Sequence, residues 1–199
     1  MDLKYHNFVA KYPTTRLANI DYFRICKSGI NSFNGKKIYL DTSSVMQTSI
    51  TDESYLITYE DRPSRANMQP HANTVWFAKL KDSPKYILVK KSDGDLLNGF
   101  IFSTGFMGLQ CEEHIVNYLY CMILSKDFND QKNLLSNGAT MQAINNDSFA
   151  EIQIPAVKKS AASDFGKEIN ECVNLISYIR QKTHRLKEIK SLLLQKYFG

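Results

Sequence analysis

Hydrophobic and polar positions change their rhythm near residue 155. Before it, short runs rich in Ile, Val, Phe, Tyr, Trp and Thr, which are typical of strands, are separated by turn-forming Gly, Asn and Asp. Asn34–Gly35 is expected to form a hairpin turn that leads into the first strand, and Asp93–Gly94 a turn before the last. The predicted strands lie within residues 36–45, 53–60, 73–80, 85–91 and 98–110.

Two stretches after these strands have helical spacing. Residues 114–125 are strongly apolar and follow two glutamates, which suit a helix N-terminus. Residues 127–138 predict a second short helix that ends at Asn137–Gly138, because Gly suits a C-terminal cap. Residues 149–155 alternate with period two, which predicts a strand closed by Pro155.

The last forty residues predict one long helix. From Ser163, a candidate N-cap, to Phe198 there is no Pro and only one Gly. Such a helix spans roughly 50 Å at about 1.5 Å per residue. Its apolar or small residues are spaced alternately four and three apart, as in a coiled coil. The expected helix-pairing positions are Phe165, Ile169, Cys172, Ile176, Ile179, Thr183, Leu186, Ile189 and Leu193.

Three arrangements of this helix are possible: packed on its own domain, paired with another helix, or lying on a membrane surface. Its length and strict heptad favour pairing, and its positive charges do not collect on one face, which disfavours the membrane. The sequence therefore predicts an α+β protein. A mixed α/β body occupies residues 1–155, and a long C-terminal coiled-coil helix occupies residues 156–199.

Composition narrows the class of protein. A chain of 199 residues with 43% hydrophobic residues has enough material for one core and an extension. No apolar run reaches eighteen residues, so no membrane span is expected, and residues 1–13 lack the apolar run of a signal peptide. The four cysteines are dispersed, which favours reduced thiols in the cytoplasm.

The net charge of +5 is unevenly distributed. Residues 1–155 carry 16 basic and 16 acidic side chains, so the excess comes from residues 156–199, with 9 basic and 4 acidic. Within the body, residues 24–91 hold 11 basic and 6 acidic side chains, and residues 92–155 hold 2 and 8. A basic region of this kind can bind a polyanion. An ordinary solvated surface is the alternative that charge alone leaves open.

The sequence lacks the motifs of common catalysts. It has no phosphate-binding glycine loop and no His-Glu-x-x-His metal motif. Cys111 and His114 have zinc-like spacing without a second pair, which is more typical of a structural Cys and a helix-start His. We therefore expect a chain that binds without catalysing, with no metal or cofactor of its own. An enzyme with an unrecognised site stays a third hypothesis.

Residues 59–73 form the densest polar segment. Arg62 and Arg65 flank a proline. Asn67, Gln69 and His71 follow at alternate positions, so an extended arm would present those three on one side. Arg pairs with guanine or phosphate, and Asn and Gln pair with adenine. Arg62, Arg65, Asn67 and Gln69 are the candidate base contacts. Alternatively, the segment is a surface loop whose arginines pair with nearby acidic residues.

Lysines at turns and strand ends are the candidate phosphate contacts. Exposed lysines are common at such positions, so each pair is weak evidence by itself. The candidates are Lys36, Lys37, Lys90 and Lys91.

A Gly-x-Thr turn, a Phe-x-x-Ile-x-Ile-Pro strand and a long helix follow the mixed α/β body. Their positions are Gly138, Thr140, Gln142 and Ile144, then Phe149, Ile152, Ile154 and Pro155, then residues 176–198. This order of parts resembles the specificity subunit of type I restriction-modification enzymes. One departure is the helix entry, where residues 156–169 replace the family's usual Pro-Leu-x-x-Gln approach.

The resemblance implies one target recognition domain and one helix, half of the family's usual subunit. Such a domain would read one half of a split sequence in double-stranded DNA. The helix would set the spacing, pair with another half or a second copy, and dock methylation and restriction subunits. AdoMet, ATP and Mg are then expected only in those partners. A non-DNA adaptor oligomerised by its coil is the alternative function.

Residues 136–155 are rich in polar side chains and carry no catalyst. They are expected to form the hinge between body and helix, with Gly138 permitting the turn and Asn145 bonding backbone groups locally. Direct DNA contact by Thr140 or Gln142 is the alternative.

Overall fold

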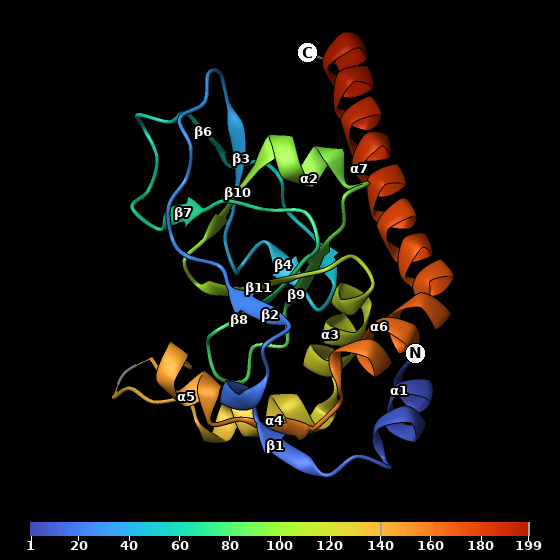
Figure 1. Ribbon diagram of the computed structural model, residues 1–199. Coiled ribbons are helices and arrows are strands. Elements are labelled where there is room, and N and C mark those ends of the chain that lie inside the picture. The colour runs from blue at the N-terminus through green and yellow to red at the C-terminus, as the bar shows by residue number, and fades with distance from the viewer. Residues whose placement is uncertain (140, 199) are drawn as a thin grey trace.

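The computed structural model describes residues 1–139 and 141–198 (Figure 1). Two four-stranded sheets, a group of helices and one long C-terminal helix make up the protein. The helices are α1 (Asp2–Val9), η1 (Leu17–Asn19), α2 (Gly94–Gly99), α3 (Ile115–Leu124), α4 (Lys126–Leu134), α5 (Asn146–Ala150), α6 (Lys159–Glu168) and α7 (Asn170–Phe198).

The first sheet has the strand order β2-β11-β8-β9 and is antiparallel throughout. Its strands are β2 (Phe23–Ile25), β8 (Thr74–Ala78), β9 (Tyr86–Val89) and β11 (Phe106–Cys111). The second sheet has the order β6-β3-β10-β7, with β3 and β10 parallel. Its strands are β3 (Lys37–Leu40), β6 (Leu56–Ile57), β7 (Ala66–Met68) and β10 (Phe100–Ser103). Two short pairs complete the strands: β1 (Thr14–Arg16) with β12 (Gln153–Pro155), and β4 (Val45–Met46) with β5 (Ser49–Ile50).

Strand β8 shows how period two builds the layers. Val75 and Phe77 belong to a core shared with the helices, while Trp76 and Ala78 belong to a core shared with the second sheet. Trp76 meets Phe102 of β10 edge to face, with ring centroids 5.2 Å apart. Every residue of β8 is buried, because both faces of the first sheet are covered.

Several predicted strands differ from those observed. Gly35 does turn with a positive φ of 76°, but the turn joins no hairpin, because β3 pairs with the distant β6 and β10 and not with the preceding strand β2. Residues 98–110 form two strands in different sheets, joined at Thr104–Gly105. The predicted strand at 149–155 begins only at Gln153, because Asn145 accepts a bond from Ser148 N and starts a short helix.

The expectation of one continuous helix from Ser163 is wrong. Helix α6 begins at Lys159 after Lys158, and the chain leaves helical geometry at Ile169, where φ is −97° and ψ is 3°. Phe165 and Ile169 are only 2% exposed and lie in the protein's own core, so neither is available to pair with another helix. Val173, in the first turn of α7, is the last fully buried apolar residue of this core.

Close packing of α6 on α3 explains the break. Gly166 faces the backbone of His114, and Asn117 of α3 donates to the Gly166 carbonyl at 2.8 Å. Helix α6 must therefore follow α3, whereas α7 departs along the side of the two sheets (Figure 1). Among the helices of residues 1–139 and 141–198, none is long and apolar enough to cross a membrane.

Lys132 of α4 is a buried cation held by backbone carbonyls. Its side chain is 1% exposed, and Nζ donates to the carbonyls of Ala78, Leu80 and Ser83 at 3.2–3.4 Å. Burial lowers the pKa of Lys132 to about 8 from its ordinary value of 10.5. The charged form is therefore less stable in the folded than in the unfolded chain.

A pH-dependent stability difference is expected from Lys132→Met. Below pH 8 the lysine is protonated in both states, so folding carries the whole burial cost. Between pH 8 and pH 10.5 the folded chain releases the proton first, and the wild type gains stability as pH rises. Urea unfolding should show that the variant's stability relative to the wild type falls by on the order of 1–3 kcal/mol between pH 7 and pH 10. A pH-independent difference would contradict this assignment.

Candidate nucleic-acid interface and assembly helix

Strand β7 presents the polar segment predicted to contact bases. Ala66 and Met68 are buried, so Asn67 between them points outward from the edge of the second sheet. Arg65, exposed, and Gln69, half-buried, stand on either side of the strand. The extended backbone covers only Ala66–Met68, and Arg65 belongs to the turn before it, where Asn67 N donates to the Arg65 carbonyl at 2.9 Å. Whether these side chains contact DNA stays a prediction.

An aromatic pair joins Arg62 to Lys37. The Arg62 guanidinium lies 4.3 Å from the ring centre of Tyr59 and donates to the Tyr59 carbonyl. Tyr59 meets Phe33 edge to face at 5.8 Å, and Lys37 Nζ lies 4.9 Å from the Phe33 ring centre. Burial lowers the pKa of Lys37. Two cations that are distant in sequence thus share one surface cluster, positioned by cation–π contacts.

The alternative for residues 59–73, in which their arginines pair with nearby acidic residues, has no support in the part of the chain that the structure describes. Neither Arg62 nor Arg65 forms an ion pair with Glu60 or Asp61 there.

The four candidate phosphate lysines lie in two separate places. Lys36 is exposed beside Lys37 at the start of β3. Lys91 is exposed but lies with Lys90 beside α7, in a hollow that Ser177 and Tyr178 also line. β7 lies on the opposite side of the two sheets from α7 (Figure 1). The structure therefore does not bring all four lysines to one surface.

The expectation of an exposed lysine is wrong for Lys90. It is only 4% exposed, and its Nζ donates to Asn170 at 2.9 Å and Asn174 at 2.6 Å, both in α7. It also reaches Asn117 of α3 at 3.4 Å. Burial lowers the pKa of Lys90, and the carboxylates of Glu113 and Asp93 oppose that shift. Lys90 therefore connects α7 to the body.

Asp93 is the next attachment point of α7. This carboxylate is 1% exposed and pairs with Arg180, and it also accepts from Gln181 at 3.0 Å and Ser177 at 3.3 Å. Arg180 also donates to the Leu88 carbonyl at 2.6 Å. A buried carboxylate with this many donors is fully hydrogen-bonded, which removes much of the cost of burying its charge.

Glu53 forms the third attachment point. It contacts His184 and accepts from Lys187 Nζ at 3.1 Å, and Lys187 also donates to the Ile50 carbonyl at 2.9 Å. Together, these contacts form a set of polar α7 residues, between Asn170 and Lys187, that bond to the body. We call this set the polar seam; its members are Asn170, Asn174, Ser177, Arg180, Gln181, His184 and Lys187.

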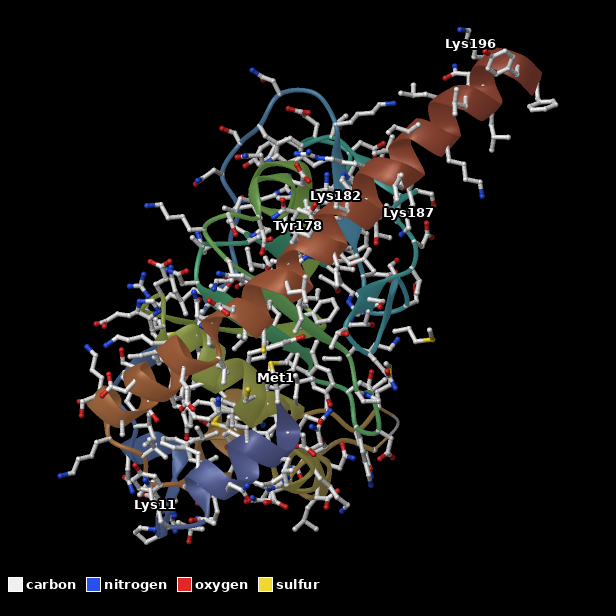
Figure 2. The ribbon with its side chains drawn as sticks, turned by 90° about the vertical axis from the view of Figure 1, so that its right-hand side faces the viewer. Met1, Lys11, Tyr178, Lys182, Lys187 and Lys196 are labelled. Atoms are coloured by element: carbon white, nitrogen blue, oxygen red, sulfur yellow. The ribbon has the colours of Figure 1, made fainter. Side chains whose placement is uncertain are left out.

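The opposite face of α7 carries an exposed apolar stripe. Its members follow heptad-like spacing and are 49–65% exposed: Leu175, Ile179, Leu186, Ile189, Leu193 and Tyr197. At about 100° per residue, Leu186 lies about 160° around the helix from His184 and about 180° from Ser177, two members of the polar seam. Figure 2 looks onto α7, whose C-terminal part extends beyond the body toward Lys196. An exposed row of large apolar residues is typical of an association surface.

The predicted helix-pairing residues divide between the exposed stripe and positions outside it. Ile179, Leu186, Ile189 and Leu193 belong to the exposed stripe, and Cys172 is exposed near its start. Thr183 is exposed, and its hydroxyl donates to the Ile179 carbonyl. Ile176 is half-buried against the core. Leu175 extends the stripe and was missed, although its spacing of four from Ile179 was visible in the sequence.

The polar corner of residues 136–155 is packed onto the body. Gly138 turns with a φ of 134°, which confirms its predicted role. Gln142 accepts from Lys81 Nζ at 2.9 Å, and its carbonyl accepts from Lys81 N at 2.9 Å. Asn145 caps α5. Thr140, predicted to stand in this turn, lies outside the described residues.

Metal ligands do not gather anywhere in residues 1–139 and 141–198: no group of three or more His, Cys, Asp or Glu there could hold a metal ion. Burial raises the pKa of the Cys111 thiol, which disfavours the thiolate that a metal needs.

Comparison with known proteins shows the fold. No protein-family model and no curated protein sequence matches the chain. A solved structure described as the HsdS subunit from Thermoanaerobacter tengcongensis matches with a TM-score of 0.56 and 19% identity, over 93% of this chain and 48% of that one. A structure concerned with complex assembly and conformational transition of the type I R-M system matches with a TM-score of 0.58 and 19% identity, over 94% and 48%.

The structural neighbours are therefore specificity subunits of type I restriction-modification systems, as the sequence resemblance indicated. The protein has a mixed α/β body and a long C-terminal helix, in agreement with that fold. It spans about half the length of the structures that it matches.

Proposed function

We propose that this chain holds one target recognition domain and one helix of a specificity subunit, reads one half of a bipartite DNA sequence, and positions methylation and restriction subunits there. The observation that carries the proposal is the structural match, which covers 94% of this chain but 48% of the neighbour. In the family pattern, a second recognition domain and a second helix account for the other half.

The chemistry in this proposal belongs to the partners. Methyl transfer, translocation and cleavage, with their AdoMet, ATP and Mg, are assigned to the methylation and restriction subunits. This chain supplies binding and geometry only. The absence of recognised catalytic motifs in its sequence is compatible with that division of labour.

Base reading is assigned to the edge of the second sheet. Asn67 points outward from β7 between two buried residues, and Arg62 is oriented by Tyr59. A side chain whose base is anchored in a strand loses less freedom on binding than one in a mobile loop, which favours specific contacts. Asn67, Gln69 and Arg62 are therefore the proposed base contacts.

Assembly is assigned to the exposed stripe of α7. The polar seam holds α7 on the body, so the apolar face points away and is free to meet another α7. A second copy gives a twofold dimer, the simplest closed arrangement for a chain with one recognition domain and one helix. Such a homodimer reads two inverted copies of one half-site, whereas pairing with a different half gives an asymmetric site.

Methylation mapping tests the function directly. We expect this chain, mixed with its methylation subunit, AdoMet and a random duplex library, to direct methylation to one two-part sequence. Asn67→Ala should change the base preference in both halves if the chain is a homodimer. The control is the methylation subunit alone, which should modify nothing specifically.

A different result would favour the adaptor hypothesis. Binding to duplex DNA should weaken steeply as salt rises, because phosphate contacts release counterions. A chain that self-associates but shows no salt-dependent DNA affinity would be an adaptor oligomerised by its helix, and the DNA-reading proposal would be wrong.

A further inference from the structure

A basic hollow opens beside β7, next to the proposed base contacts. It has a volume of about 610 Å³ and is floored by apolar residues of the two sheets, among them Met68 and Phe106. Two lysines, Lys27 and Lys79, line it, and no carboxylate does. Lys27 and Lys79 were not singled out from the sequence, because 52 residues separate them.

Neutral hydrogen-bonding groups complete the rim of the hollow. Ser28 follows Lys27 at the end of β2, and Thr104 stands in the turn between β10 and β11. Asn146 comes from the polar corner, which reaches this edge because Ile144 N donates to the Lys79 carbonyl at 3.0 Å. Four segments distant in sequence thus bring cationic and neutral hydrogen-bond donors to one hollow.

Lys79 and Arg65 are cations without a counter-ion in the part of the chain that the structure describes. Lys79 is half-buried, and neither it nor Arg65 forms an ion pair with a described residue. Burial and the nearby charge of Arg65 both lower the pKa of Lys79. Two like charges at a partly desolvated site raise the free energy of the unliganded protein, and a bound anion relieves this.

Gly105 makes room for Arg65. A Cβ placed at Gly105 would lie 2.7 Å from Arg65 Nη2, so the guanidinium passes directly over this glycine. The Thr104 amide donates to the Arg65 carbonyl at 2.8 Å, and Lys79 N donates to the Gly105 carbonyl at 2.9 Å. The Thr104–Gly105 turn therefore connects Arg65 to Lys79. Thr104 and Lys79 line the hollow, and Arg65 lies beside this turn without lining the hollow itself.

We infer that this hollow binds the sugar-phosphate backbone of a nucleic acid, with Lys27, Lys79 and Arg65 neutralising its phosphates. Ser28, Thr104 and Asn146 donate neutral hydrogen bonds to the same backbone. The inference rests on the proposed DNA-reading function and refines it. Arg65 becomes a backbone contact, which leaves base reading to Asn67, Gln69 and Arg62.

The shape of the hollow favours a polymer backbone over a small free anion. It is partly open and has two lysines from separate segments among its lining residues, rather than a closed nest of backbone amides around one phosphate. Lysine acts as a point charge, which suits phosphates at several positions along a strand. Contacts of this kind position a protein on DNA without reading sequence.

Charge removal at Lys79 tests the inference. Using the full chain, Lys79→Met should weaken binding to specific and random duplexes equally, by roughly tenfold at 0.1 M salt. It should lower the slope of log K against log salt by about 0.9. The control is Lys11→Met, an exposed lysine beside α1 (Figure 2), which should leave the slope unchanged. Circular dichroism confirms that both variants fold.

Gly105→Ala tests the same site without changing any charge. The added methyl group lies closest to the flexible end of Arg65, and next to Thr42 Cγ2 at 3.0 Å. We expect Arg65 to be displaced and Thr42 to shift by a few tenths of an ångström, so that the protein still folds. DNA affinity should fall equally on specific and random duplexes. If the fall is confined to the specific duplex, Arg65 reads a base, and its assignment as a backbone contact is wrong.

The outcomes separate this site from the function as a whole. If the wild type binds duplexes and Lys79→Met keeps the full salt slope, the hollow is not a backbone site, while the DNA-reading proposal stands. If the wild type binds no duplex, its binding to inorganic polyphosphate is measured next. Loss of polyphosphate binding in Lys79→Met would support a polyanion site that serves another polymer. A wild type that does not bind polyphosphate either would overturn both proposals.

Discussion

Gly166→Ala is expected to destabilise the protein more than an added methyl group at either glycine of α2, Gly94 or Gly99. A Cβ at Gly166 would lie 1.8 Å from the His114 carbonyl oxygen, and that atom is backbone, so it cannot swing aside. Helix α6 would have to move off α3, opening the core around Phe165. We expect the free energy of unfolding to fall by about 3 kcal/mol or more, above the usual cost of overpacking.

Urea unfolding followed by circular dichroism measures this loss, with Gly99→Ala as the matched control. Gly99 ends α2, and a Cβ there would have no atom within 4 Å. The control should therefore keep the stability of the wild type within about 0.5 kcal/mol. Equal stability of the two variants would show that α6 does not pack on α3 as described.

Leu186→Glu is expected to turn the proposed dimer into a monomer without unfolding it. Leu186 is 65% exposed in the single chain, so its own fold does not depend on it. In a twofold dimer the change places two unpaired carboxylates in the helix interface. At about 1.5–3 kcal/mol for each buried group, the dimer's dissociation constant should rise at least 100-fold.

Light scattering across a concentration series measures the change in mass. The matched control is Leu134→Glu in α4, where the leucine is 81% exposed and lies outside the stripe. This control should associate like the wild type. If both variants stay dimeric, or the wild type is monomeric at high concentration, the stripe does not mediate self-association.

The same variant separates binding by one body from reading by a dimer. A monomeric Leu186→Glu chain keeps the whole hollow and β7, so it should bind one half-site with the unchanged salt slope of a single body. Affinity for the two-part site should fall to that of the half-site, because the linked second contact is lost.

Several elements follow from local sequence. The apolar run at 114–125 became α3, and the stretch around 127–138 became α4, because side-chain periodicity and capping residues act within one segment. The turn at Gly138 follows from a backbone angle that glycine adopts without strain. The outward apolar stripe was also visible in part, since Ile179, Leu186, Ile189 and Leu193 share one helical spacing.

Residues distant in sequence decided the rest. The polar seam of α7 looks like an ordinary solvated face, because its partners Glu53, Lys90 and Asp93 lie about 80 to 130 residues earlier. Sequence spacing likewise placed Phe165 and Ile169 in the same heptad as Leu186. Only the packing of α6 on α3 shows that these two belong to the core.

The candidate DNA surface divides in the same way. The sequence by itself determined that Asn67 faces away from its two buried neighbours in β7, because that depends only on the two-residue period of a strand. It could not show that Lys90 turns inward to α7, that Lys27 and Lys79 line one hollow, or that Arg65 and Lys79 meet at the Thr104–Gly105 turn. Periodicity specifies the face of a single element, whereas the meeting of faces depends on how all the elements pack, and only the tertiary structure decided that.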